Sequence, residues 1–297
     1  MTAIGLGLAA LGRPGYLNLG HGEDLGEDRS VEALERRTHE VLDFAYETGV
    51  RYFDAARSYG RAEEFLGSWL SRRGLAPGEV TVGSKWGYTY TADWQVDADP
   101  PEVKDLSAAT FRRQLDETRS FLGEHLSLFQ IHSATLSSGV LDDGELREEL
   151  AALRASGVAI GFTTTGTEQA ATIERALEVG GFDTVQATWN LIERSAGDAL
   201  QRARDAGMGV IIKEALANGR LTDRENESAP GDVPALATVL AQPFVDVVLS
   251  GASTVEQLRS NLRARDVEWT PELEERFAGL AEPPEVYWEK RSQLAWT

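Results

Sequence analysis

Short apolar segments alternate with longer amphipathic segments along almost the whole chain. The apolar segments are rich in β-branched and aromatic residues, a composition typical of buried parallel strands. They lie at 3–8, 50–54, 80–85, 128–132, 158–162, 183–187, 208–213 and 245–250. The segments between them repeat their apolar positions with the 3.6-residue period of a helix that buries one face. These predicted helices lie near 31–48, 61–73, 108–122, 143–155, 167–179, 195–206, 233–241 and 254–264.

Eight strand–helix units in a row favour a parallel sheet, and eight units in about 250 residues fit a closed (β/α)8 TIM barrel. We therefore predict one domain over residues 1–297, with 265–297 as a C-terminal helix and tail. The rival architecture, an open doubly wound sheet, usually has a glycine fingerprint that leads from the first strand directly into a helix. The stretch "IGLGLAALGRPGYLNLG" is rich in glycine but continues as a loop with Gly, Pro and Asn, so the barrel is favoured.

Composition narrows the possible functions. The chain has 297 residues, a net charge of -19 and no cysteine, which excludes disulfides and thiolate metal ligands, and we predict no metal site. The negative field would repel nucleic acid and anionic membranes. No apolar run approaches the roughly 20 residues of a membrane span, and the start of the chain has no basic leader. We expect a cytoplasmic protein that acts on a small molecule.

Polar side chains stand where three of the predicted strands end. Asp54 ends "VRYFD", Lys85 ends "VTVGSK" and His132 ends "LSLFQIH", while Tyr59 lies in the loop after Asp54. The C-terminal ends of barrel strands carry the active site in this fold. A lysine at the end of an apolar strand must be paired or lose its charge. The four residues therefore predict one active site.

Carbonyl reduction uses all four residue types, because it delivers a hydride to carbon and a proton to oxygen. A tyrosine can donate the proton, although its usual pKa of about 10 makes the phenol a reluctant donor. A nearby ammonium, Lys85, would lower the pKa of Tyr59, and Asp54 would keep Lys85 charged. His132 would hydrogen-bond the substrate oxygen.

The sequence resembles the aldo-keto reductase superfamily in an ordered set of motifs. "YFDAARSYGRAEEFLG" resembles its Asp–Tyr signature, "VGSKWG" its lysine strand and "LFQIHS" its histidine strand, and the likeness runs from "IGLGLAALG" to "GASTVEQLRSNL". This implies an NAD(P)(H)-dependent oxidoreductase that interconverts an aldehyde or ketone, sugars included, with the alcohol. Tyr59 would be the proton donor, Lys85 and Asp54 would adjust its acidity, and His132 would orient the carbonyl.

The resemblance also implies an extended nicotinamide dinucleotide across the barrel mouth, without a Rossmann domain. "VQATWNLIER" matches the strand whose glutamine holds the carboxamide, "IKEALANGRL" the pyrophosphate loop, and "SGASTVEQLRSNL" the segment around the adenosine half. The residues matched to cofactor binding are Thr163, Thr164, Gln186, Lys213, Leu216, Asn218, Gly219, Gly251, Ser253, Gln257 and Asn261.

Three of these positions depart from the family pattern. Thr164 replaces the usual asparagine, and Lys213 stands where many members stack an aromatic ring on nicotinamide. Lys213 would have one of two roles. It would be a cation that pairs with Glu214 or with a pyrophosphate oxygen, or it would be a catalytic group. Ser253 lies near where NADP-preferring members often have arginine, and Arg259 and Arg263 are the candidates to substitute for it. The superfamily norm favours NADP(H), with NAD(H) as the second choice.

Residues of the strand-end loops are candidates for the substrate pocket: Tyr16, Arg57, Trp86, Trp94 and Trp189. Arg57 would either recognise a carboxylate or pair with Glu63 or Glu64. The segment 222–234 would be either a surface loop or a lid over the pyrophosphate.

Two other functions compete with a reductase. The first is a Schiff-base enzyme of the lyase or aldolase type with Lys85 as the nucleophile, which a neighbouring Asp54 would oppose by keeping the amine charged. The second is a non-catalytic nicotinamide-binding sensor or regulatory subunit.

Overall fold

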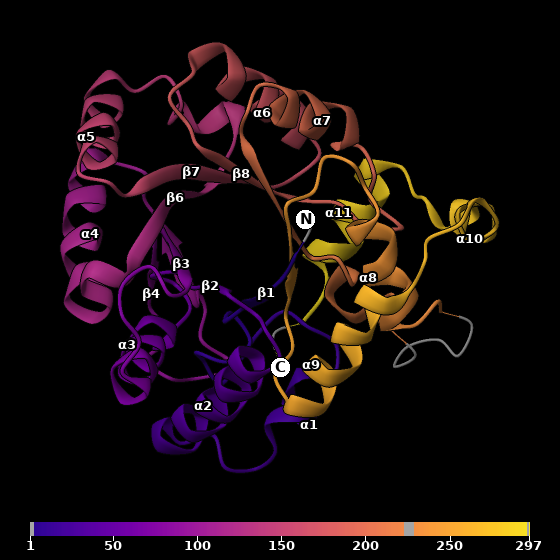
Figure 1. The fold of residues 1–297 in the computed structure, drawn as a ribbon. Helices are drawn as coiled ribbons and strands as arrows, with labels where there is room; N and C mark the ends of the chain where they lie inside the picture. The colour runs from indigo at the N-terminus through magenta and orange to yellow at the C-terminus, as the bar shows by residue number, and fades with distance from the viewer. Residues whose placement is uncertain (1–2, 223–228, 296) are drawn as a thin grey trace.

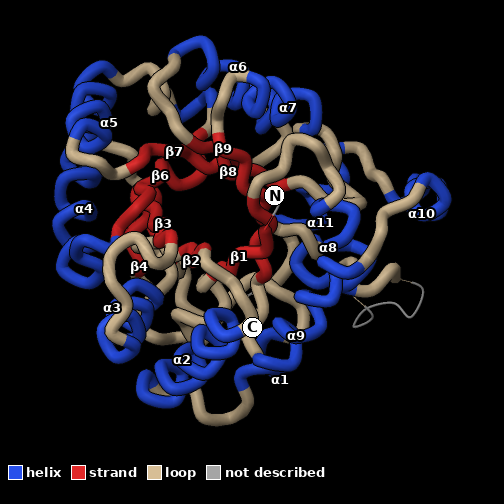
Figure 2. Tube along the Cα trace, in the orientation of Figure 1, coloured by secondary structure: helices blue, strands red, loops and turns tan. Residues whose placement is uncertain are grey.

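Eight parallel strands close into a barrel in the computed structural model, which describes residues 3–222, 229–295 and 297. Figure 1 shows the chain winding once around the barrel, and Figure 2 shows the strands as an inner ring with helices outside. The order around the ring is β1-β10-β9-β8-β7-β6-β3-β2. The barrel strands are β1 (Ala3–Gly7), β2 (Tyr52–Asp54), β3 (Thr81–Trp86), β6 (Leu126–Ala134), β7 (Ala159–Thr164), β8 (Thr184–Thr188), β9 (Gly209–Lys213) and β10 (Val247–Ser250). The predicted (β/α)8 barrel is confirmed.

The predicted helices are present between the strands, and further short helices lie in the first loop and the tail. The helices are α1 (His21–Leu25), α2 (Val31–Glu47), α3 (Ala62–Arg73), α4 (Ala108–Leu122), α5 (Gly144–Ala155), α6 (Gln169–Val179), α7 (Gly197–Asp205), α8 (Asp232–Leu240), α9 (Val255–Leu262), α10 (Pro271–Phe277) and α11 (Pro284–Ser292). The tail was predicted to contain one helix, and the structure has two, α10 and α11. The segment 222–234 lies partly outside the described residues.

Local sequence explains where the outer helices begin and which face they bury. Ser30 caps α2 by accepting a hydrogen bond from the Ala33 amide at 3.3 Å, and Ser107 caps α4 in the same way. Leu34, Val41 and Leu42 of α2 are buried, as their helical spacing predicts, and Val41 and Leu42 belong to the main core cluster. Among the described residues, no helix is long and apolar enough to cross a membrane.

The described residues form three buried apolar clusters, one of which packs Tyr287 and Trp288 of α11 against Leu191. The larger cluster lies between the strands and the helices. A smaller cluster of Tyr52, Leu128, Ile211 and Leu249 lies inside the barrel. Tyr52 precedes Asp54 by two residues on β2, so both side chains point to the inside of the barrel. The side chains of this smaller cluster thus fill the barrel interior beneath the strand ends.

An antiparallel hairpin interrupts the segment 87–105, which the sequence analysis did not predict. Its strands are β4 (Tyr88–Tyr90) and β5 (Glu102–Lys104), and Tyr88 pairs with Lys104. The hairpin follows β3 directly and stands beside the barrel mouth. It places Tyr88 and Glu102 next to the strand ends.

Candidate active site

A cavity of about 870 Å³ opens at the C-terminal ends of the strands. Asp54, Tyr59 and His132 line it, together with loops that follow β1, β9 and β10. A volume of this size lies within the roughly 300–1,000 Å³ range of ligand sites. The structure thus brings the predicted catalytic residues to one large cavity.

Lys85 and Asp54 form a buried ion pair beneath the cavity. Each side chain is at most 2% exposed, and the Lys85 ammonium donates to Asp54 Oδ2 and, at 2.9 Å, to the Ala55 carbonyl. The second carboxylate oxygen of Asp54 accepts from Gln186 Nε2 at 3.2 Å and Gln130 Nε2 at 3.4 Å. Two charges this deep are tolerated because both are paired and hydrogen-bonded.

Tyr59 lies directly above this pair. The Lys85 ammonium is 4.7 Å from the centroid of the Tyr59 ring. His132 meets the same ring edge-on, with centroids 5.6 Å apart. A phenol, an ammonium, a carboxylate and an imidazole therefore converge at one rim of the barrel.

Two glycines allow the loop that carries Tyr59 to approach the loop after β1. The Arg61 amide donates to the Gly12 carbonyl at 2.7 Å, so the two loops are joined through their backbones. A methyl group at Gly12 or at Gly60 would overlap the backbone of the opposite loop, and Gly60 has a φ of 58°. This conformation and this approach both favour glycine.

A strand irregularity aims His132 at the cavity. The pairing of β6 with β7 shifts between Ile131 and Ala134, and Ser133 has a φ of 56°. Such bulges redirect side chains near active sites. His132 packs edge-on against Tyr88 of the hairpin, with ring centroids 4.9 Å apart. Its ring is thus held between two tyrosines.

Burial controls the protonation states of His132 and Tyr59. Burial first, and then the charge of Lys85, holds the pKa of His132 well below its usual value. Burial first, and then the charge of Asp54, raises the pKa of Tyr59. At neutral pH His132 is an uncharged hydrogen-bonding group, and Tyr59 carries its proton. The low pKa expected for Tyr59 is therefore not found, because burial and then the charge of Asp54 outweigh any lowering by the Lys85 ammonium.

Most residues matched to cofactor binding line the cavity. These are Gln186, Lys213, Leu216, Asn218, Gly219, Gly251, Gln257 and Asn261. Asn218 Oδ1 is buried without a hydrogen-bond partner among the described residues. An unpaired buried acceptor in the cavity wall, together with the size of the cavity, fits a dinucleotide.

Three residues of that set lie behind the lining. Thr163 Oγ1 accepts from the Ser133 amide at 2.7 Å, and Thr164 is fully buried. Thr165, which follows them, lines the cavity. Ser253 is fully buried and donates to Gln257 Oε1 at 3.1 Å. Direct contact with a cofactor is therefore not expected from these three side chains.

Lys213 lines the cavity and faces a carboxylate. Its ammonium is 3.8 Å from Glu214 Oε1, as one of the two interpretations predicted. Burial lowers the pKa of Lys213 to about 8, although the charge of Glu214 opposes this shift.

Of the five predicted substrate-pocket residues, Tyr16 lines the cavity and the other four lie elsewhere. Trp86 follows Lys85 on β3, so it points outward and packs edge-on against Phe111 at 5.2 Å between centroids. Trp189 is buried beside Phe244. Trp94 donates to the Arg29 carbonyl at 2.7 Å.

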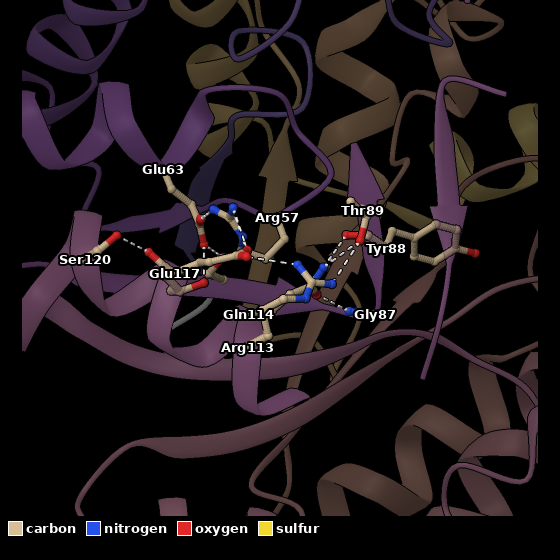
Figure 3. A network of polar contacts seen from close by, with 11 residues as sticks. Arg57, Glu63, Gly87, Tyr88, Thr89, Arg113, Gln114, Glu117 and Ser120 are labelled. Carbon is tan, nitrogen blue, oxygen red and sulfur yellow. Dashed lines mark hydrogen bonds and ion pairs between the residues drawn. The ribbon is translucent and has the colours of Figure 1, made fainter. Parts of the chain in front are cut away.

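Arg57 pairs with two carboxylates and does not line the cavity. Its guanidinium contacts Glu63 and lies 3.0 Å from Glu117, as Figure 3 shows. The same network continues to the hairpin through Arg113, which donates to Glu117 at 2.9 Å and to Thr89 Oγ1 at 3.3 Å (Figure 3). Arg57 thus supports the structure around Tyr88 and is not free to bind substrate.

Two further arginines line the cavity and were not predicted from the sequence. Arg13 lies 5.3 Å from the centroid of the Tyr59 ring and pairs with Glu102 of the hairpin at 3.0 Å. Arg291 of α11 donates through Nε to both oxygens of Glu214 at 2.9 Å. Neither stands at a strand end, so the rule that located Asp54 and Lys85 does not find them.

We expect Arg291→Met to lower the free energy of unfolding by about 3 kcal/mol at pH 7, because it leaves the buried Glu214 without its main partner. Burial raises the pKa of Glu214, but the charges of Arg291 and Lys213 outweigh burial and lower it to about 2. The variant should therefore lose the whole of this unfolding free energy above the ordinary pKa of glutamate, and the loss should become smaller as pH falls from about 4.5 towards 2. Denaturant unfolding at several pH values measures it.

Lys290→Met is the matched control for this prediction. Lys290 is on the same helix and pairs with Glu282, but its side chain is 50% exposed. A pair of this kind contributes about 1 kcal/mol or less. Equal losses in the two variants would contradict a special role for the buried pair.

Comparison with known proteins gives the same family. The model of the aldo/keto reductase family matches residues 3–238. The uncharacterized oxidoreductase YrpG of Bacillus subtilis (strain 168) is 25% identical, covering 86% of this chain and 92% of its own. The aldo-keto reductase str7 of Strobilurus tenacellus is 22% identical over 97% of this chain and 90% of its own.

Solved structures share the fold. A putative aldo-keto reductase from Pseudomonas aeruginosa superimposes with a TM-score of 0.65 and 25% identity over 89% of each chain. The holo form of aldo-keto reductase AKR11C1 from Bacillus halodurans gives a TM-score of 0.71 at 19% identity, over 94% of this chain and 92% of its own. The chain therefore belongs to the aldo/keto reductase family and is an oxidoreductase.

Proposed function

We propose that the protein interconverts an aldehyde or ketone and the corresponding alcohol with a nicotinamide dinucleotide, and that Tyr59 is the proton donor. The observation that carries this proposal is the position of Tyr59, between the Lys85 ammonium at 4.7 Å and the His132 ring at 5.6 Å, on the wall of the large cavity. A bound reduced nicotinamide supplies the hydride.

The protein's own residues would position the carbonyl and move the proton. The neutral His132 donates a hydrogen bond to the carbonyl oxygen and fixes its orientation. Tyr59 then transfers its proton to that oxygen as negative charge develops there. The Lys85 ammonium stabilises the resulting phenolate, and Asp54 keeps the ammonium charged and in place.

Gln186, Asn218 and Gln257 would hold the dinucleotide along the cavity, since all three line it. Leu216, Gly219 and Gly251 would contribute backbone and packing contacts beside them.

The wall beside Tyr59 favours a polar, hydroxylated substrate. Arg13, Glu102 and Arg291 line this end of the cavity and carry charges that can donate to or accept from hydroxyl groups. A sugar or another polyol presents such hydroxyls. A glycerol dehydrogenase from Gluconobacter oxydans has a similar fold, with a TM-score of 0.67 at 21% identity. This likeness concerns the fold and not the substrate.

A Schiff-base mechanism at Lys85 finds no support in this geometry. Lys85 is 1% exposed, lies beneath the cavity and is held as an ammonium by Asp54. A nucleophilic lysine must be neutral and must reach the substrate.

The test is a panel of aldehydes, ketones and sugars with each reduced nicotinamide dinucleotide, followed by absorbance of the cofactor. We expect turnover with hydroxylated carbonyl compounds above that with apolar aldehydes of similar size. Cofactor binding without turnover of any compound in the panel would support the sensor alternative.

A further inference from the structure

The part of the cavity wall around Tyr59 and His132 has more cations than carboxylates. The charged groups that line this catalytic wall or lie directly beneath it are the carboxylates Asp54, Glu102 and Glu214 and the cations Arg13, Lys85, Lys213 and Arg291. Besides burial and Asp54, the charges of Glu102 and Glu214 raise the pKa of Tyr59. Besides burial, the charges of Lys85, Lys213 and Arg13 lower the pKa of His132. These groups therefore surround the place where the carbonyl would react.

Each carboxylate of the catalytic wall has a cation of its own. Asp54 accepts from the Lys85 ammonium, and Glu102 accepts from Arg13 at 3.0 Å. Glu214 accepts from Arg291 Nε through both of its oxygens at 2.9 Å, and the Tyr287 hydroxyl donates to it at 3.3 Å. Three of the cations are thus matched in close pairs.

Lys213 is the cation left over from these pairs. It ends β9, lines the cavity and has a side chain that is 17% exposed. Its ammonium lies 3.8 Å from Glu214 Oε1, which is longer than the roughly 2.7–3.2 Å of an N–H···O hydrogen bond. Because Arg291 already neutralises Glu214, Lys213 only shares this carboxylate.

The other groups that face Lys213 do not supply a counter-charge. Trp288 of α11 presents its ring at 6.0 Å, and the charges of Arg291 and Lys85 are positive. Burial lowers the pKa of Lys213 to about 8, so it is largely an ammonium at pH 7. A partly buried ammonium of this kind is stabilised when an anion binds to it.

Two anions could reach the cavity in the proposed reaction, a carboxylate on the substrate and the pyrophosphate of the dinucleotide. The substrate carboxylate is favoured, because the charge of Lys213 acts on His132, the residue that would hold the carbonyl oxygen. The positive wall is also local, since the whole chain has a net charge of -19. A wall of this sign concentrates small anions at the place of reaction.

We propose that Lys213 binds a carboxylate of the substrate, so that the protein acts on aldehydes or ketones that carry such a group, sugar acids included. Glu214, held by Arg291, would position the ammonium without neutralising it fully. The inference deepens the proposed function and rests on it for the location of the carbonyl. Its main test measures binding and needs no turnover.

The test compares L-gulonate with D-glucitol, which has a CH2OH group where L-gulonate has a carboxylate. Calorimetry measures both dissociation constants on protein saturated with reduced dinucleotide, on which an alcohol cannot be oxidised. We expect L-gulonate to bind at least about tenfold more tightly, and the ratio should narrow as salt is added. In turnover, kcat/KM should likewise favour D-glucuronate over D-glucose and 4-oxobutanoate over butanal.

Lys213→Met should lower this binding ratio by at least about fivefold, while the dissociation constants of NADH and NADPH stay within about twofold. Glu214 keeps Arg291 in this variant, so no carboxylate of the catalytic wall loses its close partner. Lys290→Met is the matched control, because it removes the same charge from an exposed side chain that does not line the cavity. The ratio should be unchanged in it.

Equal binding of L-gulonate and D-glucitol by the original protein would overturn the proposal, even if neutral carbonyl compounds are reduced. An unchanged ratio in Lys213→Met would overturn the role of Lys213. If that variant instead lost dinucleotide affinity, Lys213 would bind the pyrophosphate, which also overturns the proposal. A carboxylate preference that depends on Lys213, without reduction of any carbonyl compound, would support the anion site and contradict the proposed function.

Discussion

Tyr59→Phe is expected to lower kcat/KM for carbonyl reduction by about 10³-fold, within the roughly 10²–10⁴-fold range of general acid catalysis. The substitution removes the phenolic proton and keeps the ring, so the packing against His132 and the Lys85 ammonium remains. Dinucleotide affinity should stay within about twofold of the original value. The measurements are initial rates by nicotinamide absorbance and cofactor titration by fluorescence.

Tyr90→Phe is the control for this variant, because Tyr90 is a half-buried tyrosine of the hairpin strand β4 that does not line the cavity. Its activity should match that of the original protein. Tyr59→Phe with more than a tenth of the original kcat/KM would rule out Tyr59 as the main proton donor.

Lys85→Met is expected to have two effects of different origin. The rate should fall by about 10²–10⁴-fold, because the phenolate that forms on Tyr59 loses its ammonium. Stability should fall by about 3–5 kcal/mol, because Asp54 becomes a buried charge without a counter-charge. That charge should also raise the pKa of Tyr59 further, and the pH profile of alcohol oxidation should move to higher pH.

The double variant Lys85→Met with Asp54→Asn separates these effects. Without either charge, much of the lost stability should return, since a neutral side chain of similar shape can keep the hydrogen bonds from Gln186 and Gln130. The rate of carbonyl reduction by the double variant should stay as low as that of Lys85→Met. Recovery of the rate together with stability would show that Lys85 acts only on the fold, and an unshifted pH profile in Lys85→Met would contradict its electrostatic role.

The barrel was predictable because its signal is periodic and repeated. Each strand–helix unit has its own apolar pattern, and in a parallel barrel all strand ends meet at one face, so the positions of Asp54, Lys85 and His132 follow from sequence order.

Features that depend on packing between distant segments were not predictable. Trp86 is an exception, because strand alternation after the inward-pointing Lys85 already predicts that Trp86 points outward and away from the substrate pocket. Arg13 lies in the irregular loop after β1 and Arg291 lies in the C-terminal tail. In these segments no repeating apolar pattern in the sequence predicts which way a side chain points. The balance of charge and burial at Tyr59 also depends on the full structure, so the net rise of its pKa could not be predicted from the sequence.

The interlocking of Gly12 with Gly60 restricts how this scaffold can be redesigned. Since neither backbone segment tolerates an added methyl group against the other, a library that diversifies one of them while leaving its counterpart fixed should yield mostly inactive clones. Specificity engineering should therefore transplant both segments from a single donor as one cassette.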